Sequence, residues 1–215
     1  MKKGIIITLP DYDDTTEYLS KWSFEILDEA RNKSVKIKKL RGKEVNRKDF
    51  EKVVSKLDYR MLIFNGHGSE SSIFGYKEEI IIEENDNDEI LKERITYARS
   101  CESASSLGIK SMKNTDEGCF LGYNLPFTFY IDYKWNANPR KDNVAGLFLS
   151  SSNLIPISLI KGNSANEAHG KSKKQMLKNI KKILRNKTMD SFLIAEALWN
   201  NYTSQTIIGN KEAKL

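Results

Sequence analysis

Two residues in this sequence have the type and the surroundings needed for nucleophilic catalysis, His67 and Cys101. His67 lies between two glycines in the stretch MLIFNGHG at residues 61–68, separated by two residues from the apolar run that opens it. Cys101 follows a second apolar run, residues 95–98, after a link of two residues. A cysteine becomes a nucleophile toward acyl groups when a neighbouring base takes its proton. The pair therefore indicates acyl transfer, if the fold brings the two residues together.

The elements around these residues have the order of a parallel sheet. In the first third of the chain, apolar runs typical of strands alternate with apolar residues at helical spacing. The expected order is strand, helix, strand, helix, strand, at residues 4–9, 13–32, 35–40, 46–57 and 59–64. This order predicts an α/β fold with right-handed crossovers. Because such sheets bind ligands at the carboxyl ends of their strands, we expect His67 and Cys101 at one edge.

The remainder of the chain is expected to complete a single domain over residues 1–215. Two short strands at 72–76 and 79–82 are typical of a hairpin. The pattern then predicts a helical turn at 90–92, a helix at 103–114, a strand at 118–123, a polar loop at 132–143, an element of either type at 144–149, a strand at 155–160, and helices at 163–186 and 191–202. The tail at 209–215 is polar and expected to fray.

Composition places the chain among globular proteins. Hydrophobic residues make up 39% and charged residues 30%, and the net charge of +6 permits an acidic partner without requiring one. Two cysteines in 215 residues build no disulfide framework, so we expect a reducing, cytoplasmic environment. The amino-terminal apolar run lacks the features of a signal peptide, and no stretch approaches the roughly 20 apolar residues of a membrane span. No membrane partner is expected.

The residues around Cys101 favour a reactive thiol if a helix begins there. Ser100 is expected to cap that helix and Glu102 to lie in its first turn, so that the free N–H groups of the helix favour a thiolate. The backbone N–H groups of Gly68 and Cys101 are natural donors to an oxyanion. The other histidine and cysteine fit less well. Cys119 is expected in the core, and His169 on the solvated side of a polar helix.

The two motifs resemble those of a known family, the caspase-hemoglobinase fold of clan CD cysteine peptidases. This family includes caspases, legumain, gingipains, separase and the CHAT proteases. Its signature is an apolar strand that ends in His-Gly, followed by another that ends in the catalytic Cys. The corresponding stretches here are MLIFNGHGS and ITYARSCESAS. The resemblance covers roughly the first 125 residues and does not select one branch of the family.

The resemblance implies a three-layer α/β/α sandwich around a mostly parallel sheet. It also implies that His67 is the general acid and base, and that Cys101 is the nucleophile in the hydrolysis of peptide bonds, without a metal or cofactor. The substrate would be a protein or peptide. No prodomain or processing linker is evident, so control by a protein partner or a larger assembly is expected rather than self-cleavage.

The residues that bind the substrate are less defined, and Arg99, Glu102, Asp132 and Trp135 are the candidates. Arg99 would share a side of the sheet with Cys101 if its strand continued, and could receive an acidic side chain or pair with Glu102 or Asp132. Asp132 could instead receive a basic side chain. Trp135 and Tyr133 could line the rim or pack inside.

Three alternatives remain open at this point. The lysines of helix 163–186 could bind nucleic acid, although no recognised motif accompanies them and nucleic acid is not the expected partner. The sequence Gly170-Lys171-Ser172 after a predicted strand suggests a phosphate loop, but Ala165 stands where that loop needs glycine. The chain could also be an inactive scaffold with the same fold.

Overall fold

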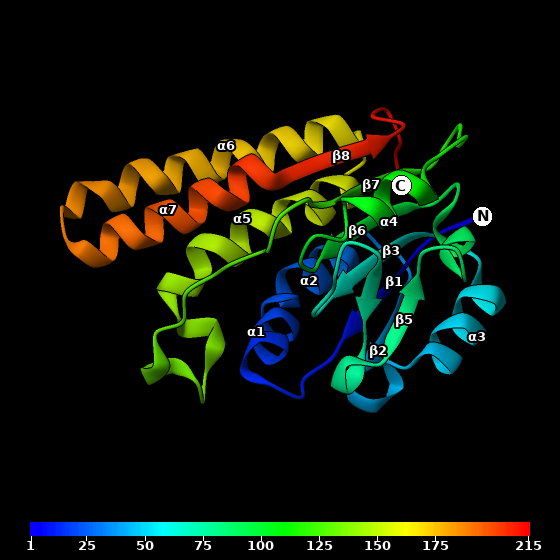
Figure 1. The fold of residues 1–215 in the computed structure, drawn as a ribbon, viewed down its shortest axis with the longest axis horizontal. Helices are drawn as coiled ribbons and strands as arrows, with labels where there is room; N and C mark the ends of the chain where they lie inside the picture. The colour runs from blue at the N-terminus through cyan, green and yellow to red at the C-terminus, as the bar shows by residue number, and fades with distance from the viewer.

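The computed structural model describes all of residues 1–215, and its centre is a six-stranded sheet with the strand order β2-β1-β3-β6-β7-β8 (Figure 1). The first five strands in this order are parallel, and β8 pairs antiparallel with β7. Their bounds are β1 Lys2–Leu9, β2 Ile37–Arg41, β3 Tyr59–Asn65, β6 Ile95–Arg99, β7 Cys119–Tyr123 and β8 Gln205–Gly209. The predicted parallel sheet is confirmed.

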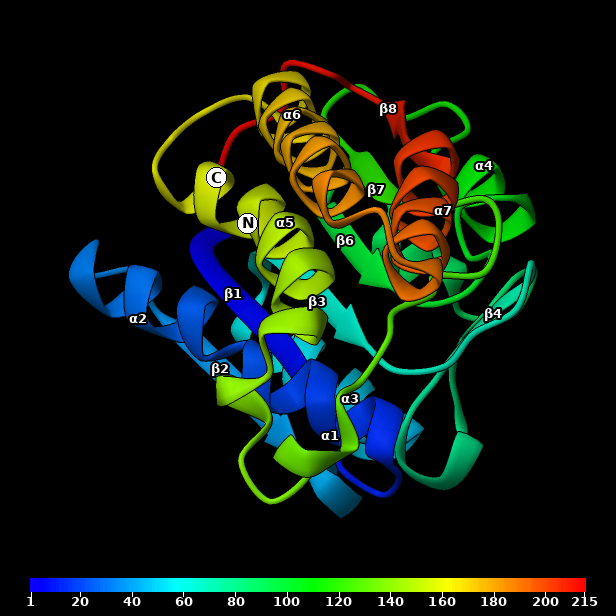
Figure 2. The ribbon, with the colours of Figure 1, turned by 90° about the vertical axis from the view of Figure 1, so that its left-hand side faces the viewer.

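Helices cover both faces of this sheet, which confirms the three-layer α/β/α prediction (Figure 2). Alternate residues of β1 point to opposite faces: Ile5 and Ile7 pack with residues of α2 and α5, whereas Ile6 packs with residues of α3. The helices are α1 Asp14–Trp22, α2 Phe24–Asn32, α3 Arg47–Leu57, α4 Ser106–Ser111, α5 Asn143–Ile160, α6 Ala165–Ile183 and α7 Met189–Ser204. A hairpin, β4 Ser72–Phe74 and β5 Ile80–Glu83, lies on the α3 side.

The predicted helix over residues 13–32 is two helices, α1 and α2, separated at Ser23. The Ser23 hydroxyl donates a hydrogen bond to the carbonyl of Leu19 at 2.8 Å and accepts one from Arg99 at 2.8 Å. A serine bonded to the carbonyl four residues earlier competes with the helical ladder and bends the chain. The break therefore depends on a residue 76 positions away, which the local pattern does not reveal.

The predicted strand over residues 155–160 is wrong, because this segment belongs to α5. Asp142 caps that helix by accepting hydrogen bonds from the N–H groups of Val144 and Ala145. Helix α5 contacts α2, β6 and α6 and is buried on most of its sides, so its apolar residues show no helical periodicity. By length and composition it is also the one helix that could span a membrane, contrary to the sequence-based expectation, but 61% of it is buried inside the protein.

The carboxyl terminus is better ordered than predicted. Strand β8 was not expected, and it pairs along its whole length with β7. The tail then packs back on α6: the carbonyls of Ala213 and Lys211 accept hydrogen bonds from the N–H groups of Ala165 and Asn166, both at 2.9 Å. These bonds satisfy two of the free N–H groups at the start of α6.

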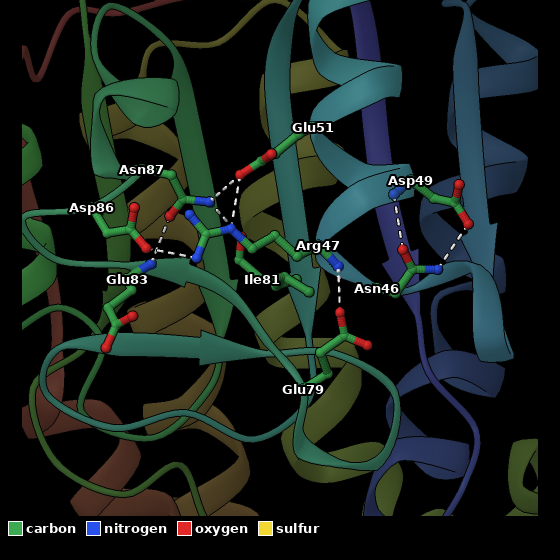
Figure 3. Close-up of polar contacts among 9 residues, drawn as sticks. All are labelled: Asn46, Arg47, Asp49, Glu51, Glu79, Ile81, Glu83, Asp86 and Asn87. Carbon is green, nitrogen blue, oxygen red and sulfur yellow. Dashed lines mark hydrogen bonds and ion pairs between the residues drawn. The ribbon is translucent and has the colours of Figure 1, made fainter.

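The β4–β5 hairpin is fixed to α3 by a polar network around Arg47 (Figure 3). The Arg47 guanidinium donates to Glu51 at 3.0 Å and to Asp86 at 2.6 Å. Asn87 donates to Glu51 at 2.8 Å and to the carbonyl of Ile81 at 3.0 Å. Although single exposed ion pairs contribute little, a connected set of them holds a short hairpin in place. This matters for function because the hairpin borders His67.

Candidate active site

The carboxyl ends of β3 and β6 lie side by side and carry the two predicted catalytic residues. The strands pair up to Asn65 opposite Arg99, and the N–H of Gly66 then donates to the carbonyl of Arg99 at 3.3 Å. Gly66 has φ +143°, a conformation that residues with a side chain rarely adopt. It turns the chain so that His67 leaves the end of the strand at the sheet edge.

Gly68 shows how closely the two strand ends approach each other. A Cβ atom at this position would lie 2.9 Å from Cβ of Ser100 and 3.1 Å from the carbonyl oxygen of Cys101. No side chain fits there. The backbone of His67–Ser69 also pairs with β4 on the side away from Cys101. There, the N–H of Phe74 donates a hydrogen bond to the carbonyl of His67 at 3.1 Å. The backbone that carries His67 is therefore held between Cys101 and the hairpin.

His67 has a partner that the sequence analysis did not assign, Asp13. Nε2 of His67 lies 2.8 Å from Oδ2 of Asp13, which comes from the loop after β1. The His67 side chain is 32% exposed. Partial burial acts to raise the pKa of Asp13, but hydrogen bonds from the N–H of Thr16 and from His67 outweigh it, so this pKa is lowered. Because an ionised carboxylate only accepts, Nε2 carries the proton and Nδ1 is free to accept another.

Cys101 is partly buried in the loop between β6 and α4. Burial raises the pKa of its thiol, the charge of Glu102 raises it further, and the backbone of Phe127 opposes the shift. The expected helix start is absent, because α4 begins only at Ser106 and Ser100 instead donates to the hydroxyl of Ser103 at 2.8 Å. A thiol in these surroundings stays protonated until a base acts on it.

The backbone N–H groups of Gly68 and Cys101 are among those at the site that have no hydrogen-bond acceptor within the protein. They come from the two adjoining strand ends and are the donors that the sequence analysis expected for an oxyanion. Glu102 has a positive φ of 55°, so the chain turns sharply immediately after Cys101. Strained backbone of this kind is often found at functional sites.

The Arg99 side chain, a predicted substrate-binding candidate, faces the interior of the protein. Its side chain is completely buried, with 0% exposure, and burial lowers the pKa of its guanidinium. Nε donates to Oδ1 of Asn65 at 2.8 Å, and Nη1 donates to Oδ1 of Asn153 at 2.7 Å. Nη2 donates to the Ser23 hydroxyl at 2.8 Å and to the carbonyl of Leu19 at 3.2 Å. Arg99 thus ties the ends of β3 and β6 to the α1–α2 junction and to α5.

The other substrate-binding candidates divide into two groups. Glu102 is beside Cys101, and its N–H donates to the carbonyl of Leu125 at 3.4 Å. Asp132 and Trp135 lie in a segment that docks on α1, where Trp22 donates to the carbonyl of Pro139 at 2.9 Å. The Asp132 carboxylate already pairs with Lys134 at 2.6 Å. Glu102 is therefore next to the nucleophile in the chain, whereas Asp132 and Trp135 belong to the segment packed on α1.

The remaining residues with possible chemistry have structural surroundings. Cys119 is fully buried as predicted, which raises the pKa of its thiol to about 12. His169 is less solvated than predicted: Nε2 lies 3.1 Å from the carbonyl oxygen of Gln205, and burial lowers the pKa of the ring. Residues 170–172 are inside α6 rather than after a strand, which excludes the phosphate loop. No cluster of three or more His, Cys, Asp or Glu side chains could hold a metal.

Comparison with known proteins supports the fold and goes no further. No family model matches the sequence, and no curated protein matches it. Among solved structures, the chain is similar to the complex of the pro- and mature domains of RgpB from Porphyromonas gingivalis, with a TM-score of 0.63 and 10% sequence identity. The match covers 99% of this chain and 48% of that one, so this chain spans about half the length of its structural neighbour. The α/β/α architecture is that of the caspase-like fold.

Proposed function

We propose that this protein is a cysteine peptidase in which Cys101 is the nucleophile, His67 the general acid and base, and Asp13 the residue that orients His67. The observation that carries the proposal is the close contact between the His67–Gly68 backbone and Ser100–Cys101 at the carboxyl edge of the sheet. The fold of its structural neighbour, a gingipain peptidase, supports the same reaction class. The substrate would be a protein or peptide.

The reaction begins with a neutral thiol, because the pKa of Cys101 is raised by burial. His67 Nδ1 accepts the Sγ proton as sulfur bonds to the carbonyl carbon of the peptide. The ionised Asp13 holds the Nε2–H and stabilises the imidazolium that forms. The free N–H groups of Gly68 and Cys101 stabilise the negative charge that develops on the carbonyl oxygen.

The tetrahedral intermediate then loses its amine. The C–N bond breaks, the imidazolium of His67 gives its proton to the departing nitrogen, and a thioester on Cys101 remains. Water attacks the carbonyl carbon of this thioester while His67 accepts a proton from the water. The C–S bond breaks, the thiolate takes back the proton, and a carboxylic acid leaves. The cycle needs only the side chains and backbone donors already described.

Cleavage of a peptide library separates this proposal from an inactive scaffold. The wild type should cleave a definable subset of peptides, and Cys101→Ala and His67→Ala should abolish cleavage. Cys119→Ala is the matched control. Because the thiol of Cys119 is buried in the core, this substitution should leave cleavage unchanged. The proposal is wrong if no peptide is cleaved, or if cleavage persists without the thiol of Cys101.

A further inference from the structure

Helices α6 and α7 form a hairpin that projects from the body of the protein. They run side by side, and the bend between them, which includes the 3-10 turn Leu184–Asn186, lies at one extreme of the long axis (Figure 1). Helix α7 leads directly into β8, whose first residue pairs with Tyr123 at the carboxyl end of β7. Helix α7, about 24 Å long for its 16 residues, therefore lies beyond this end of β7.

This α6–α7 hairpin concentrates exposed apolar side chains. Ten large apolar residues of the protein are exposed, and half of them lie here: Leu184, Met189, Phe192, Leu193 and Trp199. Met189 is 73% exposed and Phe192 53%. Scattered exposed apolar residues are ordinary on a soluble protein, but a cluster of this kind marks a site of interaction.

The orientation of α7 is the reverse of that of an ordinary surface helix. Its buried side carries the small or polar residues Ser191, Ala195 and Asn201 beside Leu198, whereas the large residues Phe192 and Trp199 face outward. A helix that only covers a core turns its large apolar residues inward. The outward residues of α7 are therefore placed for contact with something outside the protein.

The same hairpin is strongly basic. From Ala165 to Ser204 there are eight Lys and Arg residues and three Asp and Glu residues, a net charge of +5, against +6 for the whole protein. Near the bend, Lys181, Lys182, Arg185 and Lys187 are all exposed within a few residues of Leu184 and Met189. Basic and apolar side chains thus occupy one end of the molecule together.

We propose that the α6–α7 hairpin docks on the surface of an anionic lipid bilayer. Helices that lie in the bilayer interface combine Lys and Arg on one side with Trp, Phe and Leu on the other, and their basic residues are attracted by anionic headgroups. A nucleic acid would use the lysines but leave Phe192, Leu193 and Met189 in water. This mode does not involve α5, the one helix long and apolar enough to span a membrane, because the hairpin would lie on the bilayer surface without crossing it.

Vesicle co-sedimentation tests the proposal with the complete chain. Vesicles of phosphatidylcholine alone are compared with an equal mixture of phosphatidylcholine and phosphatidylserine. We expect binding only to the anionic mixture, and we expect salt to weaken it. Two double variants should each reduce binding about tenfold or more: Phe192→Ser/Leu193→Ser and Lys181→Glu/Lys182→Glu. All four substituted positions are exposed to solvent, so these variants should keep the circular dichroism spectrum of the folded protein.

Matched controls make the outcome specific. Ile109→Ser removes an equally exposed apolar residue on α4, and Lys33→Glu with Lys36→Glu reverses two exposed charges far along the chain from the hairpin; both should bind as the wild type does. Cys101→Ala should also bind unchanged, so a failed peptidase assay does not affect this test. The proposal is overturned if anionic vesicles are not bound, or if the controls weaken binding as much as the hairpin variants do. It is also overturned if the hairpin variants lose self-association or RNA binding while their vesicle binding is unchanged.

Discussion

Asp13 connects helix α1 to the imidazole of His67 through its two carboxylate oxygens. Oδ1 accepts a hydrogen bond from the N–H of Thr16 at 2.7 Å and caps α1, while Oδ2 lies 2.8 Å from Nε2 of His67. The two residues come from the loops after β1 and β3, which are neighbours in the sheet. The cap fixes the carboxylate, and the carboxylate fixes the tautomer and orientation of the ring.

Substitution of Asp13 should separate these two roles. Asn caps helices about as well as Asp, so Asp13→Asn should keep the free energy of unfolding near that of the wild type, whereas Asp13→Ala should lower it by about 1 kcal/mol. Both should reduce kcat by at least about a hundredfold, because an amide or methyl group no longer stabilises the imidazolium. Denaturant unfolding and peptide hydrolysis measure the two effects. An active Asp13→Asn variant would show that Asp13 only caps the helix.

The raised pKa of Cys101 predicts a slow, pH-dependent thiol in the free protein. Because only the thiolate reacts, the rate of alkylation by iodoacetamide should keep rising above the pH at which an ordinary cysteine, with a pKa of about 8.5, is fully reactive. Mass spectrometry of timed samples assigns the rate to Cys101 rather than Cys119. A rate that is already maximal near neutral pH would indicate a preformed thiolate and contradict the mechanism in which His67 removes the proton during attack.

Arg99 should contribute to stability through its buried hydrogen bonds. Arg99→Lys cannot reach Asn65, Asn153 and Ser23 together, and buried acceptors without a donor cost about 1–3 kcal/mol each, so we expect a loss of roughly 3 kcal/mol in the free energy of unfolding. Arg31→Lys, in an exposed ion pair with Asp28, should change it by less than about 0.5 kcal/mol. Equal, small effects of the two substitutions would mean that the buried network does not stabilise the strand ends.

Gly68 should tolerate no side chain. Gly68→Ala places a methyl group against Ser100 and the carbonyl of Cys101, so we expect a loss of about 1–3 kcal/mol in stability and a large fall in kcat as the two strand ends separate. Gly170→Ala is the matched control: it lies inside α6 with no atom within 4 Å of the added carbon, and should stabilise the protein by up to about 1 kcal/mol. Thermal unfolding and hydrolysis rates compare the two.

The parallel sheet could be predicted from sequence because its strands are buried on both faces and appear as short apolar runs. The predicted helix at 46–57 is observed as α3, and the side chain of Asn46 caps it. Helix α5 was divided wrongly because burial on nearly all sides removes the periodicity that distinguishes a helix from strands. Strand β8 was missed because its half-buried residues Thr206–Ile208 gain their partner only when β7 is in place.

The candidate site was predicted to the level of residue pairs and no further. His67 and Cys101 follow apolar runs that pair in the sheet, so the order of elements was enough to expect them at one edge. Asp13 stands at the start of the predicted helix 13–32 and was not connected with His67, because only the pairing of β1 with β3 brings together two residues that are 54 positions apart. Arg99 seemed available to a substrate because the sequence does not show that five polar groups surround its guanidinium.

The measurement that tests the peptidase assignment most directly is covalent labelling with a peptidyl acyloxymethyl ketone, which alkylates a cysteine activated by its own active site. The labelled protein is digested and the adduct located by mass spectrometry in the wild type, His67→Ala and Cys119→Ala. We predict an adduct on Cys101 in the wild type and in Cys119→Ala, and its loss in His67→Ala. Labelling of Cys119, or labelling of Cys101 that does not depend on His67, would contradict the account.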